Sequence, residues 1–249
     1  MSSPEVRVFA DADAVATAVA DALVDAMVDA QAQRGVTDIV LTGGGIGVAS
    51  LAAVRQAARA SAVDWSRVNI WWGDERYLAP GEPERNETQA RAALLDHVPL
   101  DPRRVHPMPA AGFPPSTTAD DGARAYADQL TGEAPIGQDV PAFDVLMLGM
   151  GPEGHVASLF PDSPGVRAAG SVVAVHDSPK PPPTRISLTL PALRAARAVW
   201  IIAAGAAKAE AVAACVDPNA DPVDIPAAGA RGRQSTVLWL DEQAAERLD

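Results

Sequence analysis

Short apolar runs alternate with longer stretches in which apolar residues recur every three or four positions along most of the chain. Runs of about four to eight residues rich in Val, Ile, Leu and aromatic side chains are typical of buried β-strands. The runs of this kind are Val6–Ala10, Thr37–Thr42, Val68–Trp72, Phe143–Met150, Ser171–Val175, Arg185–Leu190, Ala198–Ala204 and Thr236–Leu240. We therefore predict a strand at each of them.

The stretches between these runs predict helices. In residues 11–33, Leu23, Val24 and Met27 fall on one helical face and acidic residues fall on another. An Ala-rich helix is expected to follow Gly45 and to extend to about Ala60. Further helices are predicted at 87–96, 120–131, 205–216 and 241–248.

Strand–helix alternation with continuous apolar strands predicts an α/β fold, a mainly parallel β-sheet flanked by helices on both faces. The proline-rich stretch 99–118 and the stretch 177–184 interrupt this order. Neither carries a charge run or a repeat, so we interpret both as surface insertions within a single domain that spans 1–249.

The charge balance narrows the possible partners. The 249 residues include 20 Lys and Arg against 32 Asp and Glu, a net charge of −12. Nonspecific binding to nucleic acid or to an anionic membrane needs a basic surface, so both are disfavoured. The start of the chain lacks signal-peptide features, and no apolar run is long enough to span a bilayer. We expect a cytoplasmic protein that acts as a monomer.

The first candidate site is the glycine loop Gly43-Gly44-Gly45, between a predicted strand and a predicted helix. Backbone N–H groups in such a loop can turn toward an anion, and the helix dipole adds partial positive charge. The loop matches neither the P-loop nor the dinucleotide-binding pattern, so a small phosphate fits better than a nucleotide. A tight turn that needs positive φ is the alternative interpretation.

The second candidate is Gly73-Asp74-Glu75-Arg76, which directly follows the strand Val68–Trp72. Ligands of open α/β sheets bind beyond the carboxyl ends of the strands. The two carboxylates, Asp74 and Glu75, and the Arg76 guanidinium could therefore orient a polar substrate, or the segment could be an ordinary surface ion-pair cluster.

The third candidate is His155, which lies between glycine-rich segments after the strand Phe143–Met150. We expect it at a helix start, where the helix dipole disfavours the imidazolium and keeps the ring competent as a base. Glu153 could oppose that effect. The other histidines occur singly and Cys215 is the sole cysteine, so no metal site of the His/Cys type and no internal disulfide is expected.

Two cations stand out in this acidic chain. Arg185 opens a predicted strand, and Lys208 lies in the first turn of a predicted helix. A lysine at a helix N-terminus is electrostatically unfavourable unless an anion is bound there. Both could instead be solvated surface cations.

Together these motifs resemble the 6-phosphogluconolactonase family, within the wider group that includes glucosamine-6-phosphate isomerase/deaminase. The resemblance is carried by Leu41–Gly45, Trp72–Arg76, Asn86, Arg91, Gly149–Pro161, Pro183–Thr189, Gly205 and Lys208. The segment Gly154–Pro161 is the most specific part. The glycine loop departs from the family, because Gly45 and Ile46 stand where members carry a Ser/Thr pair.

The resemblance implies a modified Rossmann-like fold and hydrolysis of 6-phospho-D-glucono-1,5-lactone, a step of the oxidative pentose phosphate pathway. It implies a sugar-phosphate substrate and no metal or organic cofactor. His155 would be the general base, with Asp74 and Glu153 orienting the ring or the sugar. The phosphate and sugar would be held by Gly43, Gly44, Gly45, Arg76, Asn86, Arg185 and Lys208. A glucosamine-6-phosphate isomerase/deaminase and a noncatalytic sugar-phosphate-binding protein are the alternatives.

Overall fold

The centre of the molecule is a six-stranded sheet with all neighbouring strands parallel. A computed structural model describes residues 3–112, 114 and 116–248. In order across the sheet, the strands are β1 (Glu5–Phe9), β9 (Ser235–Asp241), β8 (Ala198–Ala203), β5 (Val145–Gly149), β2 (Thr37–Leu41) and β3 (Val68–Trp72). The predicted mainly parallel sheet is confirmed.

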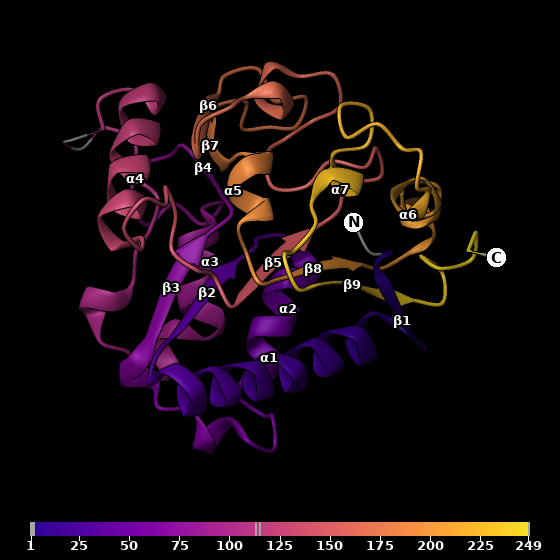
Figure 1. Cartoon of the computed structure of the whole chain (residues 1–249), viewed down its shortest axis with the longest axis horizontal. Coiled ribbons are helices and arrows are strands. Elements are labelled where there is room, and N and C mark those ends of the chain that lie inside the picture. The colour runs from indigo at the N-terminus through magenta and orange to yellow at the C-terminus, as the bar shows by residue number, and fades with distance from the viewer. Residues whose placement is uncertain (1–2, 113, 115, 249) are drawn as a thin grey trace.

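Helices cover both faces of this sheet. Figure 1 shows α1 (Ala12–Arg34) and α2 (Gly45–Val54) on one side, with α5 (Leu190–Arg194) and α7 (Pro226–Gly229) on the other. The remaining helices are α3 (Asn86–Ala93), α4 (Ala119–Glu133) and α6 (Ala209–Val216). None of the helices in the described part of the chain is long and apolar enough to cross a membrane.

Helix α1 begins and ends where its capping residues require. The Asp11 carboxylate accepts a hydrogen bond from Ala14 N at 2.8 Å, which satisfies a free N–H of the first turn. Gly35 ends the helix with φ 76°, a left-handed conformation that glycine adopts without strain. Val15, Val19 and other apolar side chains on one stripe are buried. The predicted helix over 11–33 is therefore confirmed within a residue at each end.

A second sheet was not predicted. It has three antiparallel strands in the order β4 (Asp74–Arg76), β7 (Arg185–Leu188) and β6 (Val172–Val175). The two predicted strands that became β6 and β7 exist, but placing them in the parallel sheet was wrong. The connection between them is shorter than the roughly dozen residues that a parallel crossover needs, so only antiparallel pairing was available.

Other predicted boundaries also need correction. Residues 242–248 form turns and not the predicted helix 241–248, because β9 continues through Asp241 and its carboxylate accepts from Ala244 N at 2.7 Å. The helix after Gly45 ends at Val54 instead of about Ala60. The predicted helix 205–216 begins with a 3₁₀ turn, and its α-helical part starts at Ala209.

The stretch 99–118 lies only partly on the surface; residues 113 and 115 fall outside the described part of the chain. Val105 pairs with Ile70 on β3, and the buried His106 ring stacks on Trp71 with centroids 3.9 Å apart. This segment therefore covers the edge of the parallel sheet at β3, which would otherwise expose unpaired backbone groups.

Tyr126 joins α4 to the end of β3, and its removal should be measurable in stability. Its hydroxyl is buried and accepts a hydrogen bond from Trp72 N at 3.0 Å. In Tyr126→Phe this buried N–H loses its partner, so we expect the free energy of unfolding to fall by about 1–3 kcal/mol in urea titrations. The fully exposed Ile136 supplies the control: Ile136→Ala should change stability by less than about 0.5 kcal/mol. Equal stability of Tyr126→Phe and the wild type would contradict this role.

Candidate active site

A cavity of about 540 Å³ opens where β2, β5 and β8 of the parallel sheet end, opposite β4 and β7. Of the residues predicted to act or bind, its lining includes Gly43, Gly44, Gly45, Asp74, Arg76, Asn86, His155, Arg185 and Lys208. Glu153 lies behind His155 and outside the lining. The structure thus brings the separate strand-end motifs to one site.

The glycine loop combines the two interpretations drawn from its sequence. Gly44 has φ 81° and stands immediately before α2, so the turn needs a glycine there. The first N–H groups of α2 have no acceptor within the helix, and Gly43, Gly44 and Gly45 line the cavity. A Cβ at Gly43 would lie 1.8 Å from Asn86 Oδ1, so only glycine permits this close approach.

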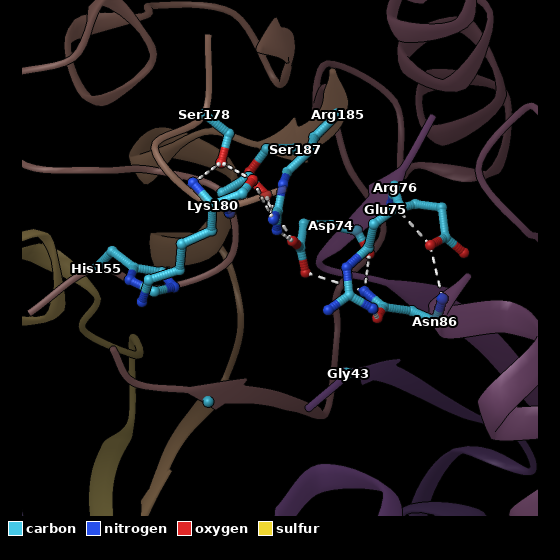
Figure 2. A network of polar contacts seen from close by, with 12 residues as sticks. Gly43, Asp74, Glu75, Arg76, Asn86, His155, Ser178, Lys180, Arg185 and Ser187 are labelled. Carbon is cyan, nitrogen blue, oxygen red and sulfur yellow. Dashed lines mark hydrogen bonds and ion pairs between the residues drawn. The ribbon is translucent and has the colours of Figure 1, made fainter. Parts of the chain in front are cut away.

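Asn86 connects Asp74 and Arg76, the first and last residues of β4. Its Nδ2 donates to the Asp74 carbonyl at 2.8 Å, and its Oδ1 accepts from Arg76 Nη1 at 2.6 Å (Figure 2). Arg76 Nη1 also donates to the Glu84 carbonyl at 2.7 Å. The guanidinium that faces the cavity is therefore held in one orientation.

Glu75 is buried, and from the sequence it had no role beyond that of a second carboxylate in the motif after β3. Its carboxylate accepts from Asn86 N at 2.7 Å and from Glu87 N at 2.8 Å, the first two N–H groups of α3. Burial raises the pKa of Glu75 to about 7, against the opposing effects of Arg85 and these N–H groups. Glu75 thus ties β4 to the start of α3 and so positions Asn86.

Asp74 lies on the opposite side of β4 and faces the loop after β5. It accepts a hydrogen bond from Ser158 Oγ at 2.6 Å. Ser158 N in turn donates to Ser187 Oγ at 3.2 Å. These contacts hold Ala157, at the cavity wall, in a left-handed conformation with φ 51°, which costs about 1–3 kcal/mol for a residue with a side chain.

His155 lies in a loop of turns, so its predicted position at a helix start is wrong. Its ring packs on Phe160, with centroids 4.4 Å apart, and its Nδ1 lies 3.2 Å from Glu153 Oε1. The ring N–H is not aimed along that line, so the contact is electrostatic and not a directed hydrogen bond. Gly151 makes room for this pair, because a Cβ there would lie 1.9 Å from Nδ1.

Burial, and not a helix dipole, keeps the His155 ring neutral. Burial lowers the pKa of His155, the Lys180 ammonium lowers it further, and Glu153 and Asp74 act in the opposite direction. The net direction is downward, so the unprotonated ring predominates at neutral pH. The expected outcome was correct although its cause was different.

Arg185 is almost completely buried, and most of its donors are occupied. Its Nη1 points to Ser158 Oγ at 3.5 Å and lies 4.0 Å from Asp74 Oδ2, at the cavity wall. The other nitrogens donate to backbone carbonyls of the segment 180–182. Arg185 therefore fastens this segment over the site as well as facing the cavity.

Lys180 lines the cavity and was missed, because the stretch 177–184 was interpreted as a surface insertion. Its rarity was an available signal, since the chain contains only Lys180 and Lys208. Lys208 was predicted in the first turn of a helix; it ends the 3₁₀ turn before α6 and is the residue that immediately precedes that helix. Burial lowers the pKa of Lys208, Lys180 lowers it further and Glu153 opposes both. In the described residues no three His, Cys, Asp or Glu side chains form a group that could hold a metal ion.

The fold and the site define an α/β protein with a cation-lined pocket at the carboxyl ends of its parallel strands. The chain belongs to the family of glucosamine-6-phosphate isomerases/6-phosphogluconolactonase, whose model matches residues 10–239. A 6-phosphogluconolactonase of Streptomyces coelicolor is 53% identical, over 99% of this chain and 95% of the relative. The Mycobacterium tuberculosis 6-phosphogluconolactonase is 49% identical over 99% of each chain. The solved structure of 6-phosphogluconolactonase from Trypanosoma brucei is 26% identical, with a TM-score of 0.86 over 100% of both chains.

The close contact between Gly43 and Asn86 can be tested by adding one methyl group. In Gly43→Ala the new Cβ would displace Asn86, and we expect the free energy of unfolding to fall by about 1–3 kcal/mol. Gly45 is the matched control, because a Cβ there meets nothing within 4 Å. Gly45→Ala should be neutral or stabilising by up to about 1 kcal/mol. Urea unfolding of both variants gives the comparison, and similar stabilities would contradict the assigned constraint.

Proposed function

We propose that this protein hydrolyses 6-phospho-D-glucono-1,5-lactone to 6-phospho-D-gluconate, a step of the oxidative pentose phosphate pathway. The observation that carries the proposal is the placement of His155, whose pKa burial lowers, in a cavity that also presents Arg76, Arg185 and Lys208. A base beside a group of cations suits the hydrolysis of an anionic sugar lactone. The lactonases that are about half identical over the full chain support the same activity.

His155 is the proposed general base. Its Nδ1 lies 3.2 Å from Glu153 Oε1, so Nε2 is the nitrogen proposed to take a proton from water. As that proton leaves, the water oxygen forms a bond to C1 of the lactone. The bond between C1 and the ring oxygen then breaks, and the proton passes from His155 to the C5 oxygen. The product is a single open-chain molecule, 6-phosphogluconate, which carries the new carboxylic acid at C1, where it ionises, and a hydroxyl at C5.

The phosphate is proposed to lie near the start of α2, within reach of the cations Arg76, Arg185 and Lys208 that line the cavity. Lys208 makes no ion pair with any described residue, so its charge is available to a ligand. The N–H groups of Gly43–Gly45 supply further donors without a Ser/Thr pair. Binding energy from the phosphate can then position the remote C1 for attack.

Replacement of the base should abolish most of the turnover. We expect His155→Ala to lower kcat by at least about 100-fold, because a general base acts on the transition state. Affinity for the product should stay within a few-fold. The assay generates the lactone from glucose 6-phosphate with its dehydrogenase and follows the release of 6-phosphogluconate.

His176 is the matched control for this variant. It is half exposed and pairs with Asp120 at 3.0 Å on the surface. His176→Ala should leave kcat nearly unchanged.

Near-normal turnover of His155→Ala would transfer the base role to Asp74 or Glu153. Ammonia release from glucosamine 6-phosphate would establish the isomerase/deaminase alternative, and binding without any turnover would establish the noncatalytic one.

Lys208 tests the position of the phosphate. A charged hydrogen bond contributes about 1.5–3 kcal/mol, so Lys208→Ala should raise KM for the phosphorylated lactone by about 10- to 200-fold. The wild type should use unphosphorylated gluconolactone poorly, and Lys208→Ala should lower activity on that lactone little further. An equal loss on both lactones would contradict a phosphate role for Lys208.

A further inference from the structure

Lys180 is held over the cavity by hydrogen bonds that other side chains donate to the carbonyls of its segment. Arg185 Nη2 donates to the Lys180 carbonyl at 3.0 Å and to the Pro181 carbonyl at 3.3 Å, and its Nε donates to the Pro182 carbonyl at 3.1 Å. Ser178 Oγ adds a bond to the Lys180 carbonyl at 3.0 Å. A freely solvated surface lysine would not need backbone contacts of this kind. Here the segment 180–182 is fixed by Arg185, the same arginine that faces Asp74.

The Lys180 ammonium contacts both carboxylate oxygens of Glu153. Its Nζ lies 3.0 Å from Oε1 and 3.1 Å from Oε2, and Oε1 is the oxygen 3.2 Å from His155 Nδ1. Figure 2 shows Lys180 extending from its segment toward the His155 ring. The side chains therefore form a chain of contacts, from Lys180 through Glu153 to His155.

We propose that Lys180 is a positioning residue, which binds Glu153 so that this carboxylate orients His155 without holding it in the protonated form. This inference rests on the proposed function, in which His155 must be unprotonated to accept a proton from water. Asp74 of β4 also faces the ring, while Lys208 lies close enough to influence both Glu153 and Lys180.

The charges of Glu153 and Lys180 explain why a carboxylate next to a base also needs a neighbouring cation. Alone, a carboxylate stabilises the imidazolium and so raises the pKa of a neighbouring histidine. Burial also acts to raise the pKa of Glu153, but the bonds from its own backbone N–H and from Lys180 outweigh this and lower it, so Glu153 stays ionised. Lys180 opposes the effect of that ionised carboxylate on His155. The ring then has both a fixed orientation and a free base form.

The test compares Lys180→Met, Lys180→Arg and Glu153→Gln with the wild type by two measurements. The first is the NMR titration of the His155 ring in the free protein, identified by its loss in His155→Gln. The second is the acid limb of the pH profile of kcat/KM. Arg55→Met is the control, because it removes one positive charge from an exposed position outside the cavity.

We expect Lys180→Met to move both titrations to higher pH. Its kcat/KM at pH 6, relative to the value at pH 8, should fall at least about twofold further than that of the wild type. Glu153→Gln should move both titrations to lower pH, and Lys180→Arg should restore the wild-type profile. The double variant Lys180→Met with Glu153→Gln should lie between the two single variants. Arg55→Met should leave both titrations unchanged.

A raised KM in Lys180→Met with an unshifted His155 titration would overturn the inference and make Lys180 a substrate ligand. An identical His155 titration in Lys180→Met, Lys180→Arg and Glu153→Gln would also overturn it. These outcomes are distinct from failure of the proposed function, which would show as no acceleration of lactone hydrolysis by the wild type, and from failure of the base role of His155, which would show as lactonase activity retained in His155→Ala. The NMR titration of the free protein needs no substrate, so it judges the Lys180 contact independently of the reaction.

Discussion

The contact of Asn86 with Gly43 is the constraint on which the rest of the site depends. Asn86 fills the space where a Cβ at Gly43 would lie, and from there it bonds to Asp74 and holds Arg76. Its own position follows from Glu75, which binds the first N–H groups of α3. The end of β2, the strand β4 and the start of α3 are thereby fixed relative to one another. A small change at this junction would move one wall of the cavity.

The second wall of the cavity depends on the small antiparallel sheet. Strand β4 pairs with β7 so that Arg76 lies opposite Arg185 in register. Two like charges at paired positions repel. Arg76 is held here by hydrogen bonds to Asn86 and to the Glu84 carbonyl. Arg185 lies beside the Asp74 carboxylate and donates to the carbonyls of 180–182. Because the protein as a whole has a net charge of −12, the positive pocket that an anionic substrate requires depends on this local arrangement of cations.

Much of this organisation follows from sequence pattern, and the exceptions have physical causes. Apolar runs located the parallel strands because those strands are buried on both faces, and the strand ends then located Asp74, His155 and Lys208. The second sheet was missed because β4 is three residues long and has no apolar run. Lys180 was missed because the stretch 177–184 was interpreted as a surface insertion: the carbonyl contacts with Arg185 that hold this segment over the cavity leave no mark in the local sequence. The part that Glu75 plays was likewise hidden, since burial of a carboxylate depends on tertiary structure.

The loop that carries His155, the proposed base, positions this side chain without regular secondary structure. A helix would orient the ring through its backbone, but this loop has turns and a strained residue, Ala157. The bonds of Ser158 to Asp74 and Ser187 offset that strain and anchor the loop to the small sheet. Because Asp74 is also bonded to Asn86, the base and the cationic wall share one rigid support. A fixed distance between the two is what a substrate needs when it is bound at its phosphate and attacked at a remote carbonyl.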